Sequence, residues 1–531
     1  EMLDSYEDEF EIFYKNVYGY VKDVNGNPIS GVAVSDGFRV VVTDANGYYR
    51  MENVTMDTWY IYISVRAEYE IPINELGQPC FYQPYPSNSP QYDFTLTPLA
   101  GGKEKKFALF AIGDPQVRNT TQFNRFNSEA VPAINKHAQE VKASGINCYG
   151  ITLGDIIANS DGTNTTALRD DMRDAFHIDK TGLPVFQVYG NHDNTYYGDG
   201  VVISADKRSS TFELKAQRNH EAIFGPVDYS FNRGDVHIVS MRNIVYQHAD
   251  KSGKYAEGFL KHQYEWLKKD LALVPKDKLV ILCVHAPIFR NTGNYVEQVE
   301  DLLSEFNEAH IVSGHTHYSR RFDHKNGIHE YIFGAASGCW WWSNNNGDGC
   351  PNGYGLIDIA GNKVVDHRYK STGFDIDYQL RVYRGNAQFG GKHEQPTLPF
   401  GADKILANVW FAHKDWKIEV YEDGKLAGNM ELMKASPYRG DEHPSLESSK
   451  DWWAIGYNTG VVGRGHKKGS TRKNYCSPCH HMYIYTLKNP NAKVKVVATD
   501  DKGREYVCDH VIEGPEYELA APPVYNVTEV W

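Results

Sequence analysis

Five short apolar runs in the chain are each followed at once by side chains that bind metal ions. The run Leu183–Tyr189 leads through Gly190 to Asn191, His192 and Asp193. The other runs, Phe107–Gly113, Tyr149–Gly154, Leu279–Val284 and Ile311–Gly314, lead to Asp114 and Gln116, to Asp155, to His285, and to His315 and His317. Carboxylate, amide and imidazole donors in one set suit first-row divalent metals, and a single carboxylate can bridge two of them.

The elements that position these side chains are predicted to be buried strands, because the runs are short and rich in β-branched and aromatic residues. Side chains at the C-terminal ends of strands lie where open α/β sheets hold their ligands. Helical patterns alternate with the runs, which predicts helices packed on both faces of a sheet. The expected helices are Arg125–Ser144, Thr165–Lys180, Lys207–Phe224, Gly258–Leu273 and Val296–Phe306.

The order of these motifs resembles that of the calcineurin-like metallophosphoesterase superfamily. The motifs are Gly154-Asp155, Gly190-Asn191-His192-Asp193, a lone His285 after a strand, and Gly314-His315-Thr316-His317. The resemblance covers residues 105–370. The first motif, Asp114-Pro115-Gln116, departs from the family's pattern, because Gln116 stands where the family has histidine.

The resemblance implies a site for two divalent metal ions, with Mn, Fe, Zn and Mg as the candidates. Asp155 would bridge the two ions. The first ion would be held by Asp114, Gln116 and His317, and the second by Asn191, His285 and His315. A metal-bridging hydroxide would then hydrolyse a phosphate ester, with His192 as the general acid. Asp193 would accept a hydrogen bond from the other ring nitrogen of His192 and so orient the ring.

Gln116 permits two interpretations. An amide oxygen is neutral and generally a weaker ligand than imidazole for Zn or Fe. Gln116 either binds the first metal and leaves that site weak and exchangeable, or it hydrogen-bonds a water on the metal.

Substrate contacts are expected from a loop and from residues near the motifs. The loop Gly338–Ser343 contains three consecutive tryptophans, which are costly to expose, so they line either a pocket or a domain interface. Tyr196 and Tyr197, just past His192, are rim candidates, and Arg118 could reach a phosphate oxygen. The predicted substrate contacts are Trp340, Trp341, Tyr196 and Arg118.

Length and composition limit the class of protein. A chain of 531 residues with 41% hydrophobic residues predicts two to four domains. The net charge is -13 and no long basic patch with interleaved aromatic residues occurs, so no nucleic-acid partner is expected. No run of eighteen apolar residues occurs, so no membrane span is expected. The expected partner is a small phosphate-ester substrate, and the oligomeric state is left open.

The predicted fold class is α/β (α+β), a four-layer metallophosphoesterase sandwich with all-β domains at both ends. Residues 1–14 are expected to be flexible, and residues 15–100 resemble carboxypeptidase-regulatory-like (transthyretin-like) β-sandwich modules through Gly31–Asp36 and Thr43–Tyr48. Residues 105–370 are expected to form the phosphoesterase domain that the resemblance implies, and residues 375–531 an immunoglobulin-like or related β-domain. This layout resembles a group of secreted bacterial phosphoesterases, so we expect a periplasmic, cell-envelope or secreted protein whose signal peptide has been removed.

The eight cysteines leave several questions open. Cys339 and Cys350 bracket a Gly/Asn-rich loop and could form a disulfide in an oxidising compartment. The stretch Cys476-Ser477-Pro478-Cys479-His480 permits three interpretations: a loop or local disulfide, half of a zinc site with His481, or a c-type haem attachment site.

Two other functions compete with phosphate-ester hydrolysis. One is a nuclease of the same superfamily, which the missing basic groove disfavours. The other is a binding or adhesion protein whose catalytic domain has lapsed and whose β-domains do the binding. Gln116 is its only support, and the retained His192 opposes it.

Overall fold

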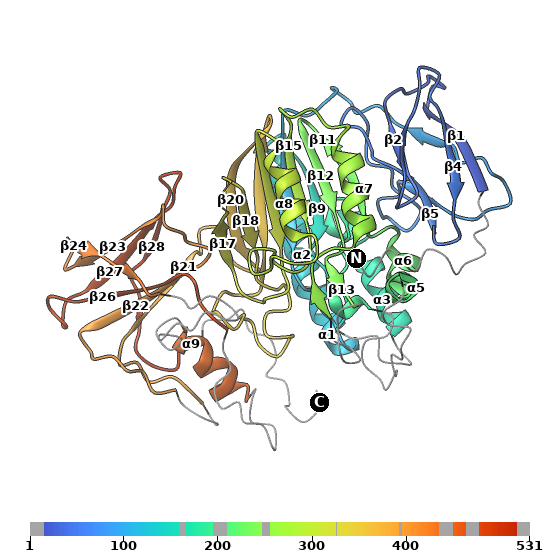
Figure 1. Ribbon diagram of the computed structural model, residues 1–531. Helices are drawn as coiled ribbons and strands as arrows, with labels where there is room; N and C mark the ends of the chain where they lie inside the picture. Colours follow the sequence, from blue (N-terminus) through green and yellow to red (C-terminus); the bar gives the residue numbers. More distant parts are fainter. Residues whose placement is uncertain are drawn as a thin grey trace.

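The structure is a computed structural model, and it describes residues 15–158, 165–194, 210–246, 255–324, 326–391, 396–434, 450–463 and 477–517. Figure 1 shows three parts in chain order: a β-rich N-terminal part, a central part with helices and sheets, and a β-rich C-terminal part. Residues 1–14, expected to be flexible, lie outside the described residues. Within the described ranges, no helix has the length and apolar character needed to cross a membrane.

Two sheets form the middle of the molecule. The first contains, in order, β10 (Val185–Phe186), β9 (Asn147–Thr152), β8 (Lys106–Ile112), β19 (Gly353–Ala360) and β20 (Lys363–Ser371). The second contains β11 (Tyr229–Arg233), β12 (Val236–Ser240), β15 (Leu279–Cys283), β16 (Glu308–Ser313), β18 (His329–Ile332) and β17 (Arg320–Asp323). Strands β8, β9 and β10 run parallel, as do β12, β15, β16 and β18. The carboxyl ends of each parallel set therefore share one edge.

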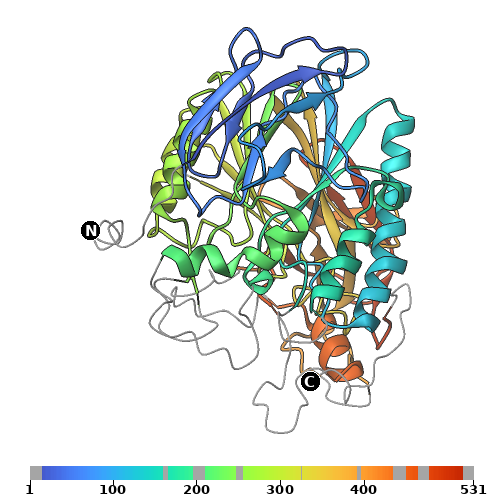
Figure 2. The same ribbon diagram turned by 90° about the vertical axis from the view of Figure 1, so that its right-hand side faces the viewer.

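Helices cover the outer face of each sheet, and Figure 2 shows the two helical layers on opposite sides of the strands. The helices over the first sheet are α1 (Thr120–Arg125), α2 (Val131–Ala143) and α3 (Thr165–Ala175). The short helix α4 (Ile178–Thr181) packs against α2. The helices over the second sheet are α7 (Lys261–Leu271) and α8 (Val296–Ser304). Two further helices, α5 (Ser210–Ala216) and α6 (Arg218–Phe224), precede β11.

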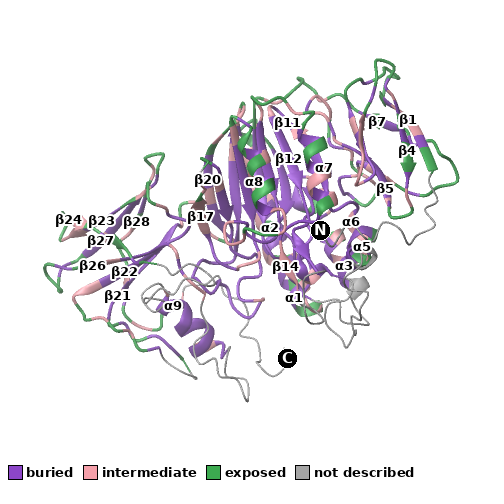
Figure 3. Ribbon diagram, viewed as in Figure 1, coloured by how far each residue is buried: buried purple, intermediate pink, exposed green. Residues whose placement is uncertain are grey.

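The layers follow from alternation along the strands. In β8, Leu109 and Ala111 enter the core between the two sheets, where they join Ile281 and Cys283 of β15. Phe110, one position along, enters the separate core beneath the helices of the first sheet. Successive side chains of a strand point to opposite faces, so a strand that is apolar throughout must be covered on both sides. Figure 3 shows the resulting band of buried strands.

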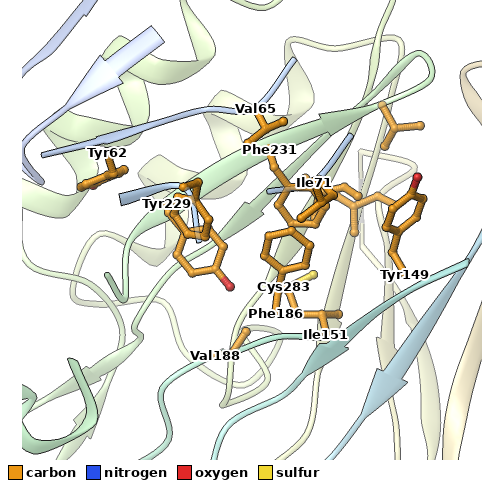
Figure 4. Packing of buried hydrophobic residues seen from close by; sticks show 14 of the residues in the cluster. Tyr62, Val65, Ile71, Tyr149, Ile151, Phe186, Val188, Tyr229, Phe231 and Cys283 are labelled. Carbon is orange, nitrogen blue, oxygen red and sulfur yellow. The ribbon is translucent and has the colours of Figure 1, made fainter. Parts of the chain in front are cut away.

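The N-terminal part is two small sheets docked on the central part. One contains β4 (Tyr48–Val54), β1 (Lys15–Asp23) and β7 (Phe94–Leu96), and the other β3 (Val40–Val42), β2 (Ala33–Ser35), β5 (Tyr60–Ile63) and β6 (Tyr82–Pro84). The backbone N–H of Asn232 donates to Val65 O at 2.8 Å, and the indole of Trp266 donates to Ser35 Oγ at 3.1 Å. Figure 4 shows Val65 beside Phe231, whose ring stacks on Phe186 at 3.8 Å.

The C-terminal part also has two sheets. One contains β25 (Glu431–Leu432), β26 (Met482–Thr486), β22 (Lys404–Val409), β21 (Leu380–Arg384) and β29 (Val511–Ile512). The other contains β24 (Lys425–Asn429), β23 (Lys417–Glu422), β27 (Val494–Thr499) and β28 (Glu505–Cys508). A short helix, α9 (Trp452–Ile455), continues into a π-helical stretch, Gly456–Val461. The ring of Phe411 stacks on Phe333 at 4.8 Å and joins this part to the central one.

The predicted fold class is confirmed, while several element boundaries differ. The run Leu183–Tyr189 pairs only at Val185 and Phe186, because the strand lies at a sheet edge and Pro184 has no N–H to donate. The helix expected from Arg125 begins with a π-helical stretch, Phe126–Ala130, ahead of α2. Two helices, α5 and α6, stand in place of the single helix expected at Lys207–Phe224. Residues 207–209 lie outside the described ranges.

Candidate metal centre

The predicted metal ligands lie in loops that follow the carboxyl ends of five strands. Asp114 and Gln116 follow β8, Asp155 follows β9, Asn191 follows β10, His285 follows β15, and His315 and His317 follow β16. Five of the seven have positive φ: Asp114 (40°), Gln116 (41°), Asp155 (52°), His315 (67°) and His317 (52°). Left-handed backbone costs a non-glycine residue about 1–3 kcal/mol and collects at functional sites. The loops therefore hold these side chains at a conformational cost.

Asp155 lies at the centre of the cluster and is buried. Its Oδ1 accepts the backbone N–H of His192 at 2.8 Å. Its Oδ2 lies 3.3 Å from Gln116 Nε2 and 3.3 Å from His285 Nε2. One carboxylate thus reaches both halves of the predicted ligand set.

His285, Asn191 and His315 form one half. The Nδ1–H of His285 donates to Leu153 O at 2.6 Å, so Nε2 of the neutral ring presents a lone pair. That Nε2 lies 2.9 Å from Asn191 Oδ1 and 3.0 Å from His315 Nδ1. The ligand atoms of Asp155, His285 and His315 all lie within 4.8 Å of one another. Electron pairs that converge in this way require a positive charge among them.

Asp114, Gln116 and His317 form the other half. The Nδ1–H of His317 donates to Gly338 O at 2.9 Å, and its Nε2 lies 3.5 Å from Asp114 Oδ1. Asp114 Oδ2 accepts the backbone N–H of His315 at 2.8 Å. Asp114 Oδ1 and Gln116 Oε1 are buried without a hydrogen-bond partner among the described residues. Buried polar atoms are normally paired, so these two oxygens fit a divalent cation that would satisfy them.

The cluster is packed so closely that glycines are required between its members. A Cβ at Gly190 would lie 2.3 Å from Asp155 Oδ1, and a Cβ at Gly314 would lie 2.5 Å from Asp114 Oδ2. Only glycine at positions 190 and 314 lets the backbone approach the Asp155 and Asp114 carboxylates this closely.

The charges in the cluster shift its pKa values strongly. Burial alone would lower the pKa of His285, but the Asp155 and Asp114 carboxylates raise it to about 9. Burial alone would raise the pKa of Asp155, but His285 and His192 hold it far below its usual range. Burial, together with the Asp155 charge, raises the pKa of Asp193 to about 7. The field at His285 thus favours positive charge at the point where the lone pairs converge.

Three family models match the chain along its length. The N terminal of calcineurin-like phosphoesterase matches residues 15–99, calcineurin-like phosphoesterase matches residues 107–319, and the C terminal of calcineurin-like phosphoesterase matches residues 330–506. The chain belongs to the calcineurin-like phosphoesterase family. The middle model contains all seven predicted ligands and His192.

Individual relatives of this phosphoesterase are distant. Purple acid phosphatase 15 of Arabidopsis thaliana is 28% identical over an alignment of 163 residues, and the match covers 28% of this chain and 26% of that protein. The chain thus spans about a quarter of that relative's length. A dimetal phosphatase from Danio rerio has 14% identity and a TM-score of 0.32, over 50% of this chain and 96% of that one. A purple acid phosphatase from yellow lupin has 13% identity and a TM-score of 0.32, over 67% and 69%.

The His192 ring of this phosphoesterase has a different hydrogen-bond partner from the one expected. Its Nδ1 contacts the carbonyl oxygen of Ala158, which fixes Nδ1 as the protonated nitrogen. The Asp193 carboxylate instead accepts backbone N–H groups, from Ile156 and Gly190, each at 2.8 Å. The predicted Asp193–His192 pair is therefore wrong. Asp193 stabilises the two loops beside the ring, and a backbone carbonyl orients the ring.

The sequence did not predict the residues that contact the ligating side chains on the side away from the cluster. His315 Nε2 lies 3.2 Å from the Tyr255 hydroxyl and 3.5 Å from Glu257 Oε1. Glu257 lies in β14 (Ala256–Glu257), which pairs with β13 (Ile244–Val245) far from any motif. Carboxylates behind a ligating histidine hold its tautomer and increase its basicity. No local pattern around Glu257 signals this role, because only the fold brings it to His315.

The predicted substrate contacts have different outcomes. Trp341 is buried, and its indole donates to Pro115 O at 2.7 Å, so it supports the first motif and is closed to a substrate. Trp342 packs with Trp452 and Trp453 of α9, which makes the tryptophan loop partly a domain interface. Trp340 is half-buried with its ring 4.7 Å from that of His317, beside the centre.

The other two predicted contacts remain untested. Arg118 is half-buried two residues beyond Gln116, and its backbone N–H donates to Gln122 Oε1 at 2.9 Å. Tyr196 and its neighbour Tyr197 lie outside the described residues, as does Cys476 of the Cys-Ser-Pro-Cys-His stretch. The structure contains no disulfide between Cys339 and Cys350.

Proposed function

We propose that this chain hydrolyses a small phosphate ester with the help of two divalent cations. The observation that supports the proposal most directly is the convergence of the six other predicted ligands around Asp155. Within that cluster two buried oxygens, Asp114 Oδ1 and Gln116 Oε1, have no hydrogen-bond partner among the described residues. Hydrogen-bonded neighbours would be expected if the cluster were only structural.

The chain's own residues divide into two ligand sets. Asp114, Gln116 and His317 would hold one cation, and Asn191, His285 and His315 the other, with Asp155 between them. Divalent cations bound in this way polarise phosphoryl oxygens and lower the pKa of water from ~15.7 toward ~7. Backbone carbonyls hold two of the three imidazoles, Leu153 O for His285 and Gly338 O for His317, so that Nε2 is the donor atom presented. His315 is held through Nε2 by Tyr255 and Glu257 and presents Nδ1.

His192 would protonate the leaving oxygen of the ester. Its Nδ1–H is committed to Ala158 O, and its backbone N–H is committed to Asp155 Oδ1. The His192 residue is half-buried, unlike the fully buried His285. A histidine held beside the ligands but outside the ligand set is suited to general acid catalysis.

Gln116 would bind the first cation through Oε1. Its Nε2 lies 3.3 Å from Asp155 Oδ2, which orients the amide and leaves Oε1 as the unpaired atom. Because an amide oxygen is neutral, this ion would be held less tightly than the ion at His285 and His315. The first ion would thus exchange more readily with the solution.

The experiment is hydrolysis of chromogenic phosphate monoesters and bis-phosphate esters by the metal-stripped chain with Mn²⁺ restored. We expect no turnover without metal, turnover with Mn²⁺, and a loss of most of that turnover in Asp155→Asn. A chain that binds Mn²⁺ at this centre yet hydrolyses neither ester class would contradict the proposal and favour a catalytic domain that has lost its activity. A nucleic-acid substrate in the same assay separates the nuclease alternative.

A further inference from the structure

A second group of metal-binding side chains lies where the central part meets the C-terminal part. Asp348 and Cys350 belong to the loop between β18 and β19, and His481 immediately precedes β26. All three side chains are completely buried, and their ligand atoms lie within 4.8 Å of one another. None of them belongs to the centre around Asp155.

The separations in this group match a tetrahedral metal site. His481 Nε2 lies 3.2 Å from Asp348 Oδ2 and 3.6 Å from Cys350 Sγ. Zinc bonds are about 2.0–2.1 Å to nitrogen, about 2.0–2.2 Å to oxygen and about 2.3 Å to sulfur. Tetrahedral angles between such bonds place nitrogen roughly 3.3 Å from oxygen and roughly 3.6 Å from sulfur. A zinc ion would therefore fit with little movement of the three side chains.

The tautomer of His481 directs its lone pair at the other two ligands. Asn408 Nδ2 donates to Asp348 O at 2.8 Å and to Asp451 Oδ2 at 2.7 Å, so Asn408 Oδ1 is the acceptor facing His481. The Nδ1–H of His481 donates to that Oδ1 at 2.7 Å. The Nε2 lone pair of the neutral ring then faces the buried Asp348 carboxylate, which is repulsive unless a positive charge lies between them, and it also faces the Cys350 sulfur.

The backbone holds Asp348 in place for such an ion. Asp348 Oδ2 accepts the N–H of Ser319 at 2.7 Å, and Oδ1 accepts the N–H of Cys350 at 3.0 Å. Gly349, between the two ligands, has φ +86°, and a Cβ there would lie 1.9 Å from Asp451 Oδ2. Only glycine permits this Asp-Gly-Cys turn to enter the interface, so the geometry of the two ligands is set before any ion binds.

We propose that Asp348, Cys350 and His481 bind one zinc-type divalent cation that joins the tryptophan loop to the C-terminal part. One carboxylate, one thiolate and one neutral imidazole carry two negative charges, which a divalent ion neutralises inside the protein. Of the stretch that was considered as half of a zinc site, only His481 is assigned as a ligand, and its partners Asp348 and Cys350 lie more than a hundred residues earlier in the chain. Metal binding releases the thiol proton of Cys350 to solvent.

Cys479 lies beside the site but is not assigned as a ligand. Its Sγ is 3.5 Å from His481 Nδ1 and 4.0 Å from Nε2, so it lies closer to the nitrogen that carries the proton. Two alternatives to a metal follow from the same neighbours: a protonated His481 paired with Asp348, or a disulfide between Cys350 and Cys479.

Cobalt substitution tests the proposal on the full chain. Co²⁺ bound to a thiolate gives a near-ultraviolet charge-transfer band, and none of the seven residues assigned to the centre around Asp155 is a cysteine. We expect the band in the metal-stripped, Co²⁺-loaded wild-type chain and in Asp155→Asn. We expect its loss in Cys350→Ser and its retention in the matched control Cys148→Ser, which removes a buried thiol from the core beneath the helices of the first sheet.

Metal content and stability give a second readout. Wild type is expected to retain one more zinc ion per chain than Cys350→Ser, and chelation is expected to lower the Tm of wild type more than that of the variant. Asp348→Asn, which keeps the side-chain volume, serves if Cys350→Ser fails to fold, and it should weaken zinc binding. The proposal is overturned by a wild-type spectrum without the band, by a band that survives Cys350→Ser, or by a Cys350–Cys479 disulfide in protein purified without reductant.

Discussion

His285 Nε2 lies 2.9 Å from Asn191 Oδ1, and both atoms are acceptors when the histidine is neutral, because Nδ1–H is donated to Leu153 O. Asp155 Oδ2 lies 3.3 Å from the same Nε2. A proton or a metal cation must occupy the space among these three atoms. All three residues are buried. The hydrolytic chemistry proposed for this chain depends on the cation being a metal.

His192→Ala tests the general acid. Removal of a positioned proton donor typically costs 10²–10⁴-fold in rate, so kcat should fall by about that factor while metal content is unchanged. Steady-state kinetics with Mn²⁺ and elemental analysis of the same sample measure both quantities. His510→Ala, an exposed histidine in the C-terminal part, is the control. A variant that loses both metal ions together would show that His192 acts as a ligand.

Glu257→Gln tests the carboxylate that contacts Nε2 of His315. Loss of such a partner typically costs about 10–100-fold in metal affinity, and the loss should affect only the ion held by His285 and His315. Metal titration followed by calorimetry resolves the two sites. Glu297→Gln, an exposed glutamate on α8, should leave both affinities unchanged. Equal weakening of the two sites in Glu257→Gln would contradict a local role.

Gln116→His tests the weak first site. Imidazole is a better ligand than an amide for Zn or Fe, so the variant should bind the first ion more tightly and exchange it more slowly. The measurement is the rate at which a chelator removes each ion from wild type and variant. Wild type that releases its two ions at one common rate would contradict the difference that we expect between the sites.

Trp341→Ala and Trp340→Ala should separate stability from substrate binding. Trp341 is buried with its indole bonded to Pro115 O, so its truncation should cost about 3–5 kcal/mol in the free energy of unfolding. Trp340 is half-buried beside His317, so its truncation should raise KM with little effect on unfolding. Urea titrations and steady-state kinetics measure the two effects. If Trp340→Ala left KM unchanged for every ester tested, its predicted substrate contact would be wrong.

The sequence predicted the elements that carry the centre because their signals are local. Apolar runs, glycines and ligand types lie within a few residues of one another at Asp155, Asn191 and His315, and these positions do meet in the fold. The strand before Asn191 was predicted too long, because pairing depends on the partner strand and on Pro184 as well as on apolar character.

The partners of the ligands could not be predicted, because they depend on contacts between distant segments. The carbonyl oxygens of Ala158, Leu153 and Gly338 orient three imidazoles, and any residue type supplies such an oxygen. The family resemblance implied a pair between His192 and Asp193, yet the Asp193 carboxylate accepts the backbone N–H groups of Ile156 and Gly190. The pairing of Asp348 and Cys350 with His481 likewise depends on how the C-terminal part packs on the central one.

Anomalous diffraction from a crystal of the Mn²⁺-loaded chain tests the central claim most directly. We predict two manganese peaks beside Asp155, one within bonding distance of Asp114 and His317 and the other of His285 and His315. A fully active Mn²⁺-loaded protein whose crystals show no manganese beside Asp155 would contradict the account.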